Sequence, residues 1–502
     1  MNKEYITIPK TISYTELSKE KSLSPSNYQK LFLKNKNVKL LNDLISHPLT
    51  GGKEIGSNKY IKKSTHYFIR TKAISKESYI INYDSKGITP ILPQAFIDNE
   101  LKEGDIIIAK DSKIGEVVII DRDLPTYMLS GGFKKLDVLE NKYYVFAVLK
   151  SDFFKKQLNI LISKGATIRH AKTKFLDCVI PFPNQKNDDE LFKYITALVK
   201  TIIKKENEIQ KKNKKINDII EQELLENQKN NTFHYHYPSY DEINEFGRID
   251  TGLYSYNFKE RTFLIDNYKY GAENIEKWGF EPSRGQNLQL TSIGKSIYSD
   301  VRKTNFYKLF LPTNLTSYGT VSKIIYLGNK NKLKCLEKGD IIFGAEGFQK
   351  GRTIVVPSEL EKTITNIHGI VFKSSKQDLT ESIFIRCFIN YLRDKGLIDS
   401  FAVGGNGGSM AQKYWNIINF PKFHESIQKK ISELYYNPID CKEHFSINDF
   451  EEKNENISDI SGILQLDYQI KIIQEKLDYM LYQIINDKEI EVDFEFYNQA
   501  FT

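Results

Sequence analysis

Hydrophobic residues recur every seven positions between residues 188 and 228, a stretch without proline or glycine. The recurring positions are Ile195, Ile202, Ile209 and Ile216, and Leu198 lies on the same seam between the first two. A row of this kind is the seam along which helices pack in a coiled coil. The pattern predicts one long helix, roughly 60 Å in length at about 1.5 Å per residue, with a partner helix against its apolar side.

A second seam lies near the C-terminal end of the chain. It comprises Ile463, Leu466, Ile470, Ile473, Leu477, Met480 and Ile484. Upstream, the spacing of Ile427, Ile431 and Leu434 predicts a shorter helix that ends before a proline, and the polar residues 448–456 predict a loop. Because each seam needs a partner, we expect the two long helices to pair with each other.

Two similar phrases, LKEGDIIIAKDS at residues 101–112 and LEKGDIIFGAEG at residues 336–347, have the pattern of a turn that enters a strand. In each case a glycine-containing loop and a second β-branched run follow, which predicts a hairpin. The predicted strands are Ile106–Ala109 with Val117–Ile120, and Ile341–Phe343 with Thr353–Val356. The hairpin tips are predicted to be basic, through Lys110, Lys113, Lys350 and Arg352. The Gly-Asp pair is typical of a turn, so its aspartate needs no catalytic role.

The phrase is one of three landmarks that occur twice in the same order. THYFIRTKAI (65–74) precedes the first phrase and FYKLFLPTNL (306–315) the second; both contain an apolar pair, one residue and a threonine. VIPFP (179–183) and IINFP (417–421) follow. Solenoid repeats have periods of about 20 to 50 residues. A separation of about 235 residues therefore predicts a duplicated domain.

The composition fits a folded protein with more than one domain. The chain has 502 residues, of which 40% are hydrophobic and 27% charged, and this length exceeds one ordinary core. The 72 Lys and Arg against 64 Asp and Glu give a net charge of +8, which permits a polyanionic partner without requiring one. The lysines of residues 204–215 predict a solvated helix face. Four dispersed cysteines, with no leader or membrane-spanning run in the sequence, predict a cytoplasmic protein.

Two short motifs bear on enzymatic chemistry, and neither fits its pattern. Gly294-Lys295-Ser296 resembles the end of a phosphate-binding loop, but Gln289 stands where that loop requires glycine. Residues 404–409, GGNGGS, follow a helix-like segment instead of the strand of a dinucleotide fold. The sequence contains no recognisable catalytic or metal-binding set. A nucleotide-dependent enzyme that uses either motif, and a coiled-coil scaffold that binds protein, are the alternative interpretations.

Together the landmarks resemble the specificity (S) subunit of type I restriction–modification systems. The resemblance consists of F-[IL]-x-T, L-x-x-G-D-I-I, I-x-F-P and a heptad helix, all occurring twice within residues 30–487. In the first half the matching residues are Phe68, Ile69, Thr71, Leu101, Gly104, Asp105, Ile180, Phe182 and Pro183. In the second half they are Phe310, Leu311, Thr313, Leu336, Gly339, Asp340, Ile418, Phe420 and Pro421. The second copy departs from the first at Pro312 and Asn419, where the first has Arg70 and Pro181.

The resemblance implies an α/β fold with two tandem target-recognition domains, separated by two long antiparallel coiled-coil helices. The implied boundaries are 1–186 and 231–423 for the recognition domains, 187–230 for the central helix and 424–502 for the C-terminal helical region. Each recognition domain would read one half of a bipartite site in double-stranded DNA. The chain itself would be non-catalytic and would hold no cofactor or metal.

The resemblance also implies protein partners. The helices would dock methyltransferase (M) subunits, two in number, which bind S-adenosylmethionine, and restriction (R) subunits would use ATP. The C-terminal segment 466–492 also resembles the tail of fused, type IIG-like methyltransferases. The alternative is therefore a type IIB or IIG-like two-subunit system, in which the partner both methylates and cuts DNA.

Basic and amide side chains on loops are the candidates for contacts with DNA, because Arg and Lys suit phosphates and guanine, and Asn suits adenine. In the first half they are Arg70, Lys72, Lys110, Lys113, Arg169, His170 and Lys172. In the second half they are Lys295, Arg302, Lys303, Lys350, Arg352, Asn406 and Lys413. For each of them, a surface charge without a role in DNA binding is the competing interpretation.

Overall fold

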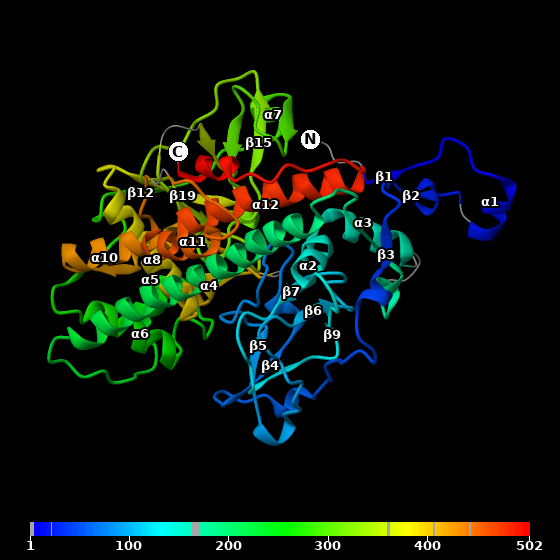
Figure 1. Ribbon diagram of the computed structural model, residues 1–502. Coiled ribbons are helices and arrows are strands. Elements are labelled where there is room, and N and C mark those ends of the chain that lie inside the picture. The colour runs from blue at the N-terminus through cyan, green and yellow to red at the C-terminus, as the bar shows by residue number, and fades with distance from the viewer. Residues whose placement is uncertain are drawn as a thin grey trace. The chain divides into compact units, whose positions relative to one another are not determined.

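The computed structural model divides into two compact units (Figure 1). The structure describes residues 5–21, 23–162, 171–358, 362–404, 407–440 and 443–501. Unit 1 comprises the described residues of Met1–Glu208, Ile439–Ile460 and Leu466–Thr502, and unit 2 those of Ile209–Pro438 and Ser461–Gln465. Within the described ranges, no helix combines the length and apolar character that crossing a membrane requires.

Unit 1 contains two three-stranded sheets. In the first, β4 (His66–Ile69) lies between antiparallel β5 (Ile88–Ile91) and parallel β8 (Tyr127–Leu129). In the second, β6 (Ile106–Ala109) lies between β7 (Val117–Ile119) and β9 (Phe133–Leu136), both antiparallel to it. The other elements of its α/β part are β1 (Ile6–Thr7), α1 (Tyr14–Glu20), β2 (Lys30–Leu31), β3 (Val38–Leu40), α2 (Lys142–Lys150), α3 (Asp152–Leu161) and β10 (Val179–Pro181), the last of which pairs with β3.

Unit 2 repeats this topology and adds one strand to each sheet. β14 (Tyr307–Leu309) lies between antiparallel β15 (Ile325–Asn329) and parallel β18 (Thr363–Ile364), with β13 (Ser296–Ser299) beyond β15. β16 (Ile341–Gly344) lies between β17 (Thr353–Val355) and β19 (Gly369–Ser374), with β12 (Phe280–Arg284) beyond β19. β11 (Ala272–Asn274) pairs with β22 (Asn419–Pro421), as β3 pairs with β10. The predicted duplication is confirmed.

The remaining helices of unit 2 are short, apart from one that follows β19. They are α5 (Tyr240–Phe246), α6 (Tyr256–Asp266), α7 (Leu290–Ile293), α8 (Leu379–Asp394), α9 (Leu397–Phe401) and α10 (Glu425–Tyr435). A two-strand hairpin of β20 (Ala402–Val403) and β21 (Ser409–Met410) frames the glycine-rich segment. The helix predicted upstream of the proline at 438 is confirmed as α10.

The repeated phrase forms the same turn and hairpin in both units. Gly104 and Gly339 have φ angles of 85° and 89°, a left-handed conformation that favours glycine. Asp105 accepts a bond of 2.9 Å from the N–H of Lys102, and Asp340 accepts one of 2.9 Å from the N–H of Glu337. The aspartates therefore hold the turn, as predicted, and the β6–β7 and β16–β17 hairpins follow it.

The alignment of the two copies that the F-[IL]-x-T landmark predicts differs by one residue from the alignment that the strand pairing gives. The Tyr67 N–H donates to Thr126 O, and the Lys308 N–H donates to Lys362 O, both at 2.9 Å. Tyr67 therefore corresponds to Lys308, and Phe310 corresponds to Ile69 instead of Phe68. The alignment of Phe68 with Phe310 is wrong because two adjacent apolar residues are buried in each copy, and such a pair does not fix the strand register.

Both long helices that the heptad seams predict are present. α4 (Asp188–Glu226) is one continuous helix in Figure 1, and α12 spans Ile463–Ile485. All twelve seam residues are buried: Ile195, Leu198, Ile202, Ile209, Ile216, Ile463, Leu466, Ile470, Ile473, Leu477, Met480 and Ile484. Within unit 1, Lys205 Nζ donates to Gln469 Oε1 at 2.7 Å, whereas the Ile490 N–H donates to Gln185 Oε1 at 3.0 Å. Along α4 the contacts go from Gln185 to Lys205, whereas along α12 the partners go from Ile490 back to Gln469. These parts of the two helices therefore run antiparallel.

The predicted polar loop over residues 448–456 is wrong, because α11 (Phe450–Ile460) occupies most of it. Phe450, Asn454 and Ile457 are buried at helical spacing, a row that the surrounding Glu, Lys and Asn residues hide in the sequence. The Phe450 ring stacks on Phe494 at 4.5 Å. On the opposite side of α11, Glu455 pairs with Lys204 of α4. Unit 1 therefore has three helices in its helical part, where the sequence predicted two.

α4 is attached to the α/β part of unit 1 through Glu206. Its carboxylate accepts bonds from the N–H groups of Tyr79 (2.8 Å) and Ile80 (3.1 Å) and from the Ser78 hydroxyl (3.1 Å). From the other direction, the Lys150 ammonium donates to the carbonyls of Lys76 and Ser78. Burial raises the pKa of Glu206 and lowers that of Lys150. Glu206 of α4 and Lys150 of α2 thus both bind the loop of residues 76–80.

In unit 2, α4 is attached through Glu221. Arg261 of α6 donates to this carboxylate at 2.8 Å, the Lys395 ammonium lies 3.0 Å away, and the Tyr391 hydroxyl of α8 donates as well. Burial alone would raise the pKa of Glu221, but the bonds from Tyr391, Arg261 and Lys395 outweigh it and lower the pKa to about 2. A different residue on the same helix thus performs the same task in each unit.

Glu221→Gln is expected to destabilise unit 2 by about 1.5 to 3 kcal/mol at pH 7, the usual contribution of hydrogen bonds to a charged group. The folded-state pKa lies below that of the unfolded chain, so this contribution is complete above about pH 5 and is lost as the pH falls toward 2. Urea unfolding midpoints measured from pH 7 to pH 3 should show the difference from wild type shrinking. Asp218→Asn, which changes a 62% exposed carboxylate on the same helix, is the control and should stay within about 0.5 kcal/mol.

Candidate nucleic-acid interface

All four cations predicted at the hairpin tips interact with their own unit. Lys113 Nζ donates to the carbonyl of Ile74, and burial lowers the pKa of Lys113. Lys350 Nζ, in a side chain that is 8% exposed, donates to Gly407 O and pairs with Asp399, both at 2.7 Å. These ammonium groups hold adjacent loops against the hairpins.

Arg352, which directly precedes the second strand of its hairpin, also bonds to a neighbouring loop. Its Nη1 donates to the carbonyl of Leu315 at 2.7 Å, and burial lowers the pKa of Arg352 to about 10. Lys110, in the first unit, is half-buried and lies 3.3 Å from Asp111. Backbone carbonyls that the fold brings close thus accept hydrogen bonds from Lys113, Lys350 and Arg352. The contacts of the basic tips with DNA stay a prediction.

The other predicted residues of unit 1 differ in exposure. Arg70 is half-buried, donates from Nη2 to Lys86 O at 2.6 Å and lies 5.7 Å from the ring of Tyr60. Lys72 and Lys172 are exposed. Arg169 and His170 lie outside the described residues, as does Asn406 of the second half.

In unit 2, Lys295, Arg302, Lys303 and Lys413 are exposed. Lys295 lies between α7 and β13, directly after Gly294 with a φ of 74°. A phosphate-binding loop runs from a strand through the glycines into a helix, whereas this segment runs from a helix into a strand. The geometry therefore does not support the nucleotide-binding interpretation of Gly294-Lys295-Ser296.

The glycine-rich segment packs against protein. The Gly347 N–H donates to Gly408 O at 2.9 Å, and a Cβ placed on Gly407 would lie 2.6 Å from the backbone of Gly347. Gly407 and Gly408 thus fit closely on the β16–β17 hairpin, an arrangement that does not suit a nucleotide cradle.

Four basic side chains surround one cavity in unit 2. The cavity has a volume of about 480 Å³ and is lined by Arg302, Lys303, Thr304, Asn305, Phe306, Lys308, Tyr326 and Lys362. Of these, the sequence predicted only Arg302 and Lys303. Lys308 and Lys362 come from β14 and from the residue before β18, and the parallel pairing of these strands brings them together. Strand pairing is not visible in a loop-by-loop search for basic residues.

A basic pair also precedes the corresponding strand of unit 1. Lys62 and Lys63 are exposed and lie just before β4, as Arg302 and Lys303 lie just before β14. The sequence prediction missed this pair. Extending the comparison of the two copies a few residues upstream of F-[IL]-x-T would have revealed it.

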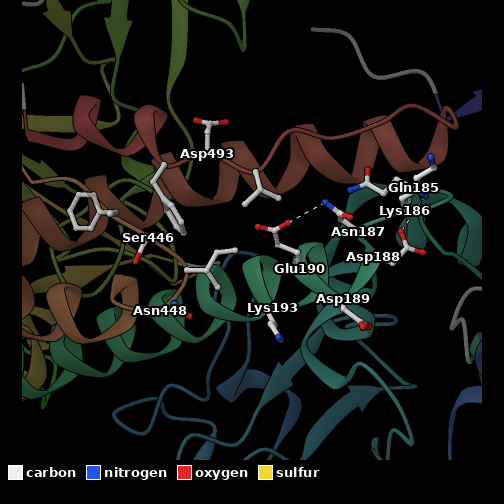
Figure 2. Close-up of a pocket in the computed structure, with 14 residues that line it drawn as sticks. Gln185, Lys186, Asn187, Asp188, Asp189, Glu190, Lys193, Ser446, Asn448 and Asp493 are labelled. Carbon is white, nitrogen blue, oxygen red and sulfur yellow. Dashed lines mark hydrogen bonds between the residues drawn. The ribbon is translucent and has the colours of Figure 1, made fainter.

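A larger cavity, of about 940 Å³, lies in unit 1 at the start of α4 (Figure 2). Its lining comes from the first turns of α4, the segment before α11 and the chain after α12. Asp188, Asp189 and Glu190 lie in the first helical turn, where carboxylates stabilise the positive end of the helix dipole. Figure 2 shows Asn187 bonded to Glu190, at 3.5 Å. These acidic residues are therefore explained by helix initiation.

Over the part of the chain that the structure describes, no group of three or more His, Cys, Asp or Glu side chains could hold a metal ion. Its three described cysteines, Cys178, Cys335 and Cys387, are free thiols, and burial raises the pKa of each. A thiol with a raised pKa is a poor nucleophile. Neither a metal site nor a reactive thiol thus stands out among the described residues, whereas the cavity lined by Arg302, Lys303, Lys308 and Lys362 does.

Lys350→Gln is expected to lower the free energy of unfolding by about 1 to 3 kcal/mol, because it leaves a buried carbonyl and Asp399 without their cation. Lys295→Gln removes the same charge from an exposed side chain of the same unit and should change the free energy by less than about 0.5 kcal/mol. Thermal and urea unfolding of both variants test this. Equal stability of the two variants would contradict the assignment of Lys350 as a structural cation.

Comparison with known proteins bears on the first half of the chain directly. Residues 34–213 match the family model of the type I restriction modification DNA specificity domain. No curated protein sequence is significantly similar to the chain.

Solved structures include three similar chains. The S subunit of a type I restriction–modification system from M. genitalium is 12% identical, with a TM-score of 0.37 over 90% of this chain and 97% of that chain. A chain from a study of complex assembly and conformational transition of the type I R-M system is 12% identical, with a TM-score of 0.28 over 90% and 98%. The HsdS subunit of Thermoanaerobacter tengcongensis is 11% identical, with a TM-score of 0.26 over 90% and 96%. By the match to the family model, residues 34–213 are similar to type I restriction modification DNA specificity domains.

Proposed function

We propose that the chain is the DNA sequence-specificity subunit of a type I restriction–modification complex, in which each α/β unit reads one half of a bipartite site. The observation that carries the proposal is the repetition of one strand topology in two units. The family model covers the first copy, and the second copy has the same turn, the same hairpin and the same pairing of its central strands. A chain with two copies of one DNA-reading domain suits a site with two specific halves.

In this proposal the long helices hold the two recognition domains apart and dock two methyltransferase subunits, with restriction subunits joining the complex. S-adenosylmethionine and ATP would bind those partners, and this chain would be non-catalytic and cytoplasmic. The helical part of unit 1 supports a docking role, because α4, α11 and α12 each bury apolar residues, among them Ile202, Phe450 and Ile473. A rigid helical body of this kind suits a stable interface.

The purified chain alone is expected to transfer no methyl group and to hydrolyse no nucleotide, whereas its complex with the methyltransferase partner should bind duplex DNA with an affinity that falls steeply with salt. Labelled S-adenosylmethionine and ATP assays, with fluorescence anisotropy of a duplex between about 50 and 200 mM salt, measure these properties. Turnover by the chain alone that is lost on Lys295→Ala would favour the nucleotide-dependent enzyme. Salt-independent binding, or none with the partner, would favour the scaffold. A partner that both methylates and cuts would indicate the type IIB or IIG-like system.

Exchanging residues 231–423 for the equivalent segment of a relative with another target is expected to change one half of the methylated sequence and leave the other half unchanged. The reciprocal exchange of residues 1–186 is the matched control and should change the opposite half. Sequencing of methylated bases in cells that carry the complete system measures both. Alteration of both halves by one exchange would contradict the assignment of one half-site to each unit.

A further inference from the structure

A cluster of aromatic rings lies on unit 2 just beyond the end of α4. Phe233, Tyr235 and Tyr237 belong to the segment after α4, whereas Tyr256 and Phe263 belong to α6. The centre of the Phe233 ring lies 5.5 Å from that of Tyr256 and 5.4 Å from that of Phe263. The centre of the Tyr235 ring lies 5.9 Å from that of Tyr256 and 6.0 Å from that of Tyr237. These five rings form one connected cluster, which we call the tyrosine surface.

Three rings of the tyrosine surface are exposed to solvent. Tyr237 is 84% exposed, Tyr256 56% and Tyr235 41%. A single exposed ring on a soluble protein is ordinary, whereas connected exposed rings mark an interaction surface. Tyrosine suits this use because its ring buries a large area on contact and loses little conformational freedom.

A buried lysine holds the segment after α4 against α6. Lys259 Nζ donates to the carbonyl of His236 at 3.0 Å, pairs with Glu242 at 3.1 Å and lies 5.9 Å from the centre of the Tyr235 ring. The Tyr235 hydroxyl donates to the carbonyl of Tyr254 at 3.1 Å. These contacts fix the position of the rings before a partner binds, which lowers the entropic cost of binding.

The charges around the rings are mainly negative. Residues 233–260, all of which the structure describes, contain five acids against two bases. Both bases are paired with acids of the same segment, Arg248 with Asp250 and Lys259 with Glu242, and their side chains are at most 10% exposed. Two of the acids, Asp241 and Glu245, are exposed on α5. This charge opposes the approach of DNA phosphates and favours a protein with exposed arginine or lysine, whose cations also bind tyrosine rings.

Unit 1 contains a similar segment that protein covers. Residues 487–501, which follow α12, contain five acids against one base. Their rings Phe494 and Tyr497 lie 4.5 Å and 5.2 Å from the ring of Phe450 on α11, and both are buried. The segment after α4 has the same acidic and aromatic character, yet its tyrosines are exposed. The comparison favours protein as the material that covers the tyrosine surface.

The tyrosine surface is also fixed to α4. Arg261 of α6 donates to Glu221 of α4 at 2.8 Å, and Gln228, just after α4, donates to the carbonyl of Leu264 at 2.9 Å. A subunit that docks on this end of α4 would therefore reach the rings as well. The methyltransferase is the subunit expected on the long helices, so it is the partner that this position favours.

We propose that the tyrosine surface docks the methyltransferase partner, with Tyr235, Tyr237 and Tyr256 packing against apolar groups and arginine or lysine side chains of that subunit. This inference rests on the proposed function, and it adds to the interface a surface outside the heptad helices. The exposed acids on α5 would speed the approach of the basic partner, and the rings would supply the larger part of the affinity.

The test measures assembly of the full chain with its methyltransferase partner by isothermal titration calorimetry without DNA. Tyr237→Ser with Tyr256→Ser is expected to weaken assembly about tenfold or more, because aromatic residues carry much of the affinity of protein interfaces. Tyr14→Ser with Tyr298→Ser is the matched control, since these tyrosines are 83% and 56% exposed and lie outside the tyrosine surface. It should bind like wild type.

A second variant removes charge and keeps the rings. Asp241→Asn with Glu245→Gln is expected to weaken assembly about threefold at low salt and to have little effect at high salt, because salt screens exposed charges. The melting temperatures of all variants should equal that of wild type, since the changed side chains are exposed. If Tyr256→Ser lowers the melting temperature, Tyr237→Ser alone and the charge variant decide the question.

Four outcomes would overturn the inference. Wild-type affinity of the tyrosine variant would show that the rings do not meet the methyltransferase, and an equal loss in the matched control would show a non-specific effect of exposed rings. Normal assembly with weaker DNA binding by the complex would assign the surface to nucleic acid. A wild-type dimer that the tyrosine variant dissociates, seen by light scattering, would assign it to a second copy of the chain. Failure of the proposed function is distinct, because the wild-type chain itself would then not bind the methyltransferase, and the inference would fall with it.

Discussion

The attachment of α4 to each α/β unit through a glutamate is the interaction on which the rest of the structure depends, because α4 contributes residues to both units. A carboxylate removed from water is costly unless hydrogen bonds replace its hydration. Glu206 receives two N–H groups and a hydroxyl, and Glu221 receives two cations and a phenol. The pKa values of the two glutamates shift in opposite directions. Burial raises the pKa of Glu206, whereas hydrogen bonds lower the pKa of Glu221. Each fixes the helix to a specific loop or helix pair, which apolar packing alone does with less specificity.

Most of the fold followed from patterns that repeat. The heptad rows predicted α4 and α12, because the same apolar position recurs over many helical turns. The Gly-Asp phrase predicted two hairpins and a duplication, because it occurs twice in the same context. The sequence predictions were wrong where a pattern was short or where charged residues interrupted it. Phe68 and Phe310 were aligned one residue out of register, since adjacent buried residues carry no alternation. The sequence predicts a loop in place of α11 because charged residues separate its buried residues Phe450 and Ile457.

The candidate site was less predictable than the fold, for a physical reason. A lysine in a sequence has the same charge whether its ammonium faces solvent or a backbone carbonyl. Lys350 and Lys303 were equal candidates by sequence, yet one is 8% exposed and bonded to Gly407, and the other lines an open cavity. Lys308 and Lys362 were missed because only the parallel pairing of β14 with β18 brings them together. Which carbonyls and strands come close is a property of the tertiary fold, and a single sequence does not state it.

The duplication also separates the features that could read bases from those that could not. If the two units read different half-sites, what both share is required by the fold or by the DNA backbone, which is common to all sequences. The positive-φ glycines and the aspartate of the turn belong to the fold. Sequence reading must then use features in which the copies differ. Among the described residues, the sheets of unit 1 have no counterpart of β12 and β13. Lys295 lies exposed directly before β13. The surface around β13 is therefore where unit 2 has the freedom to recognise a sequence of its own.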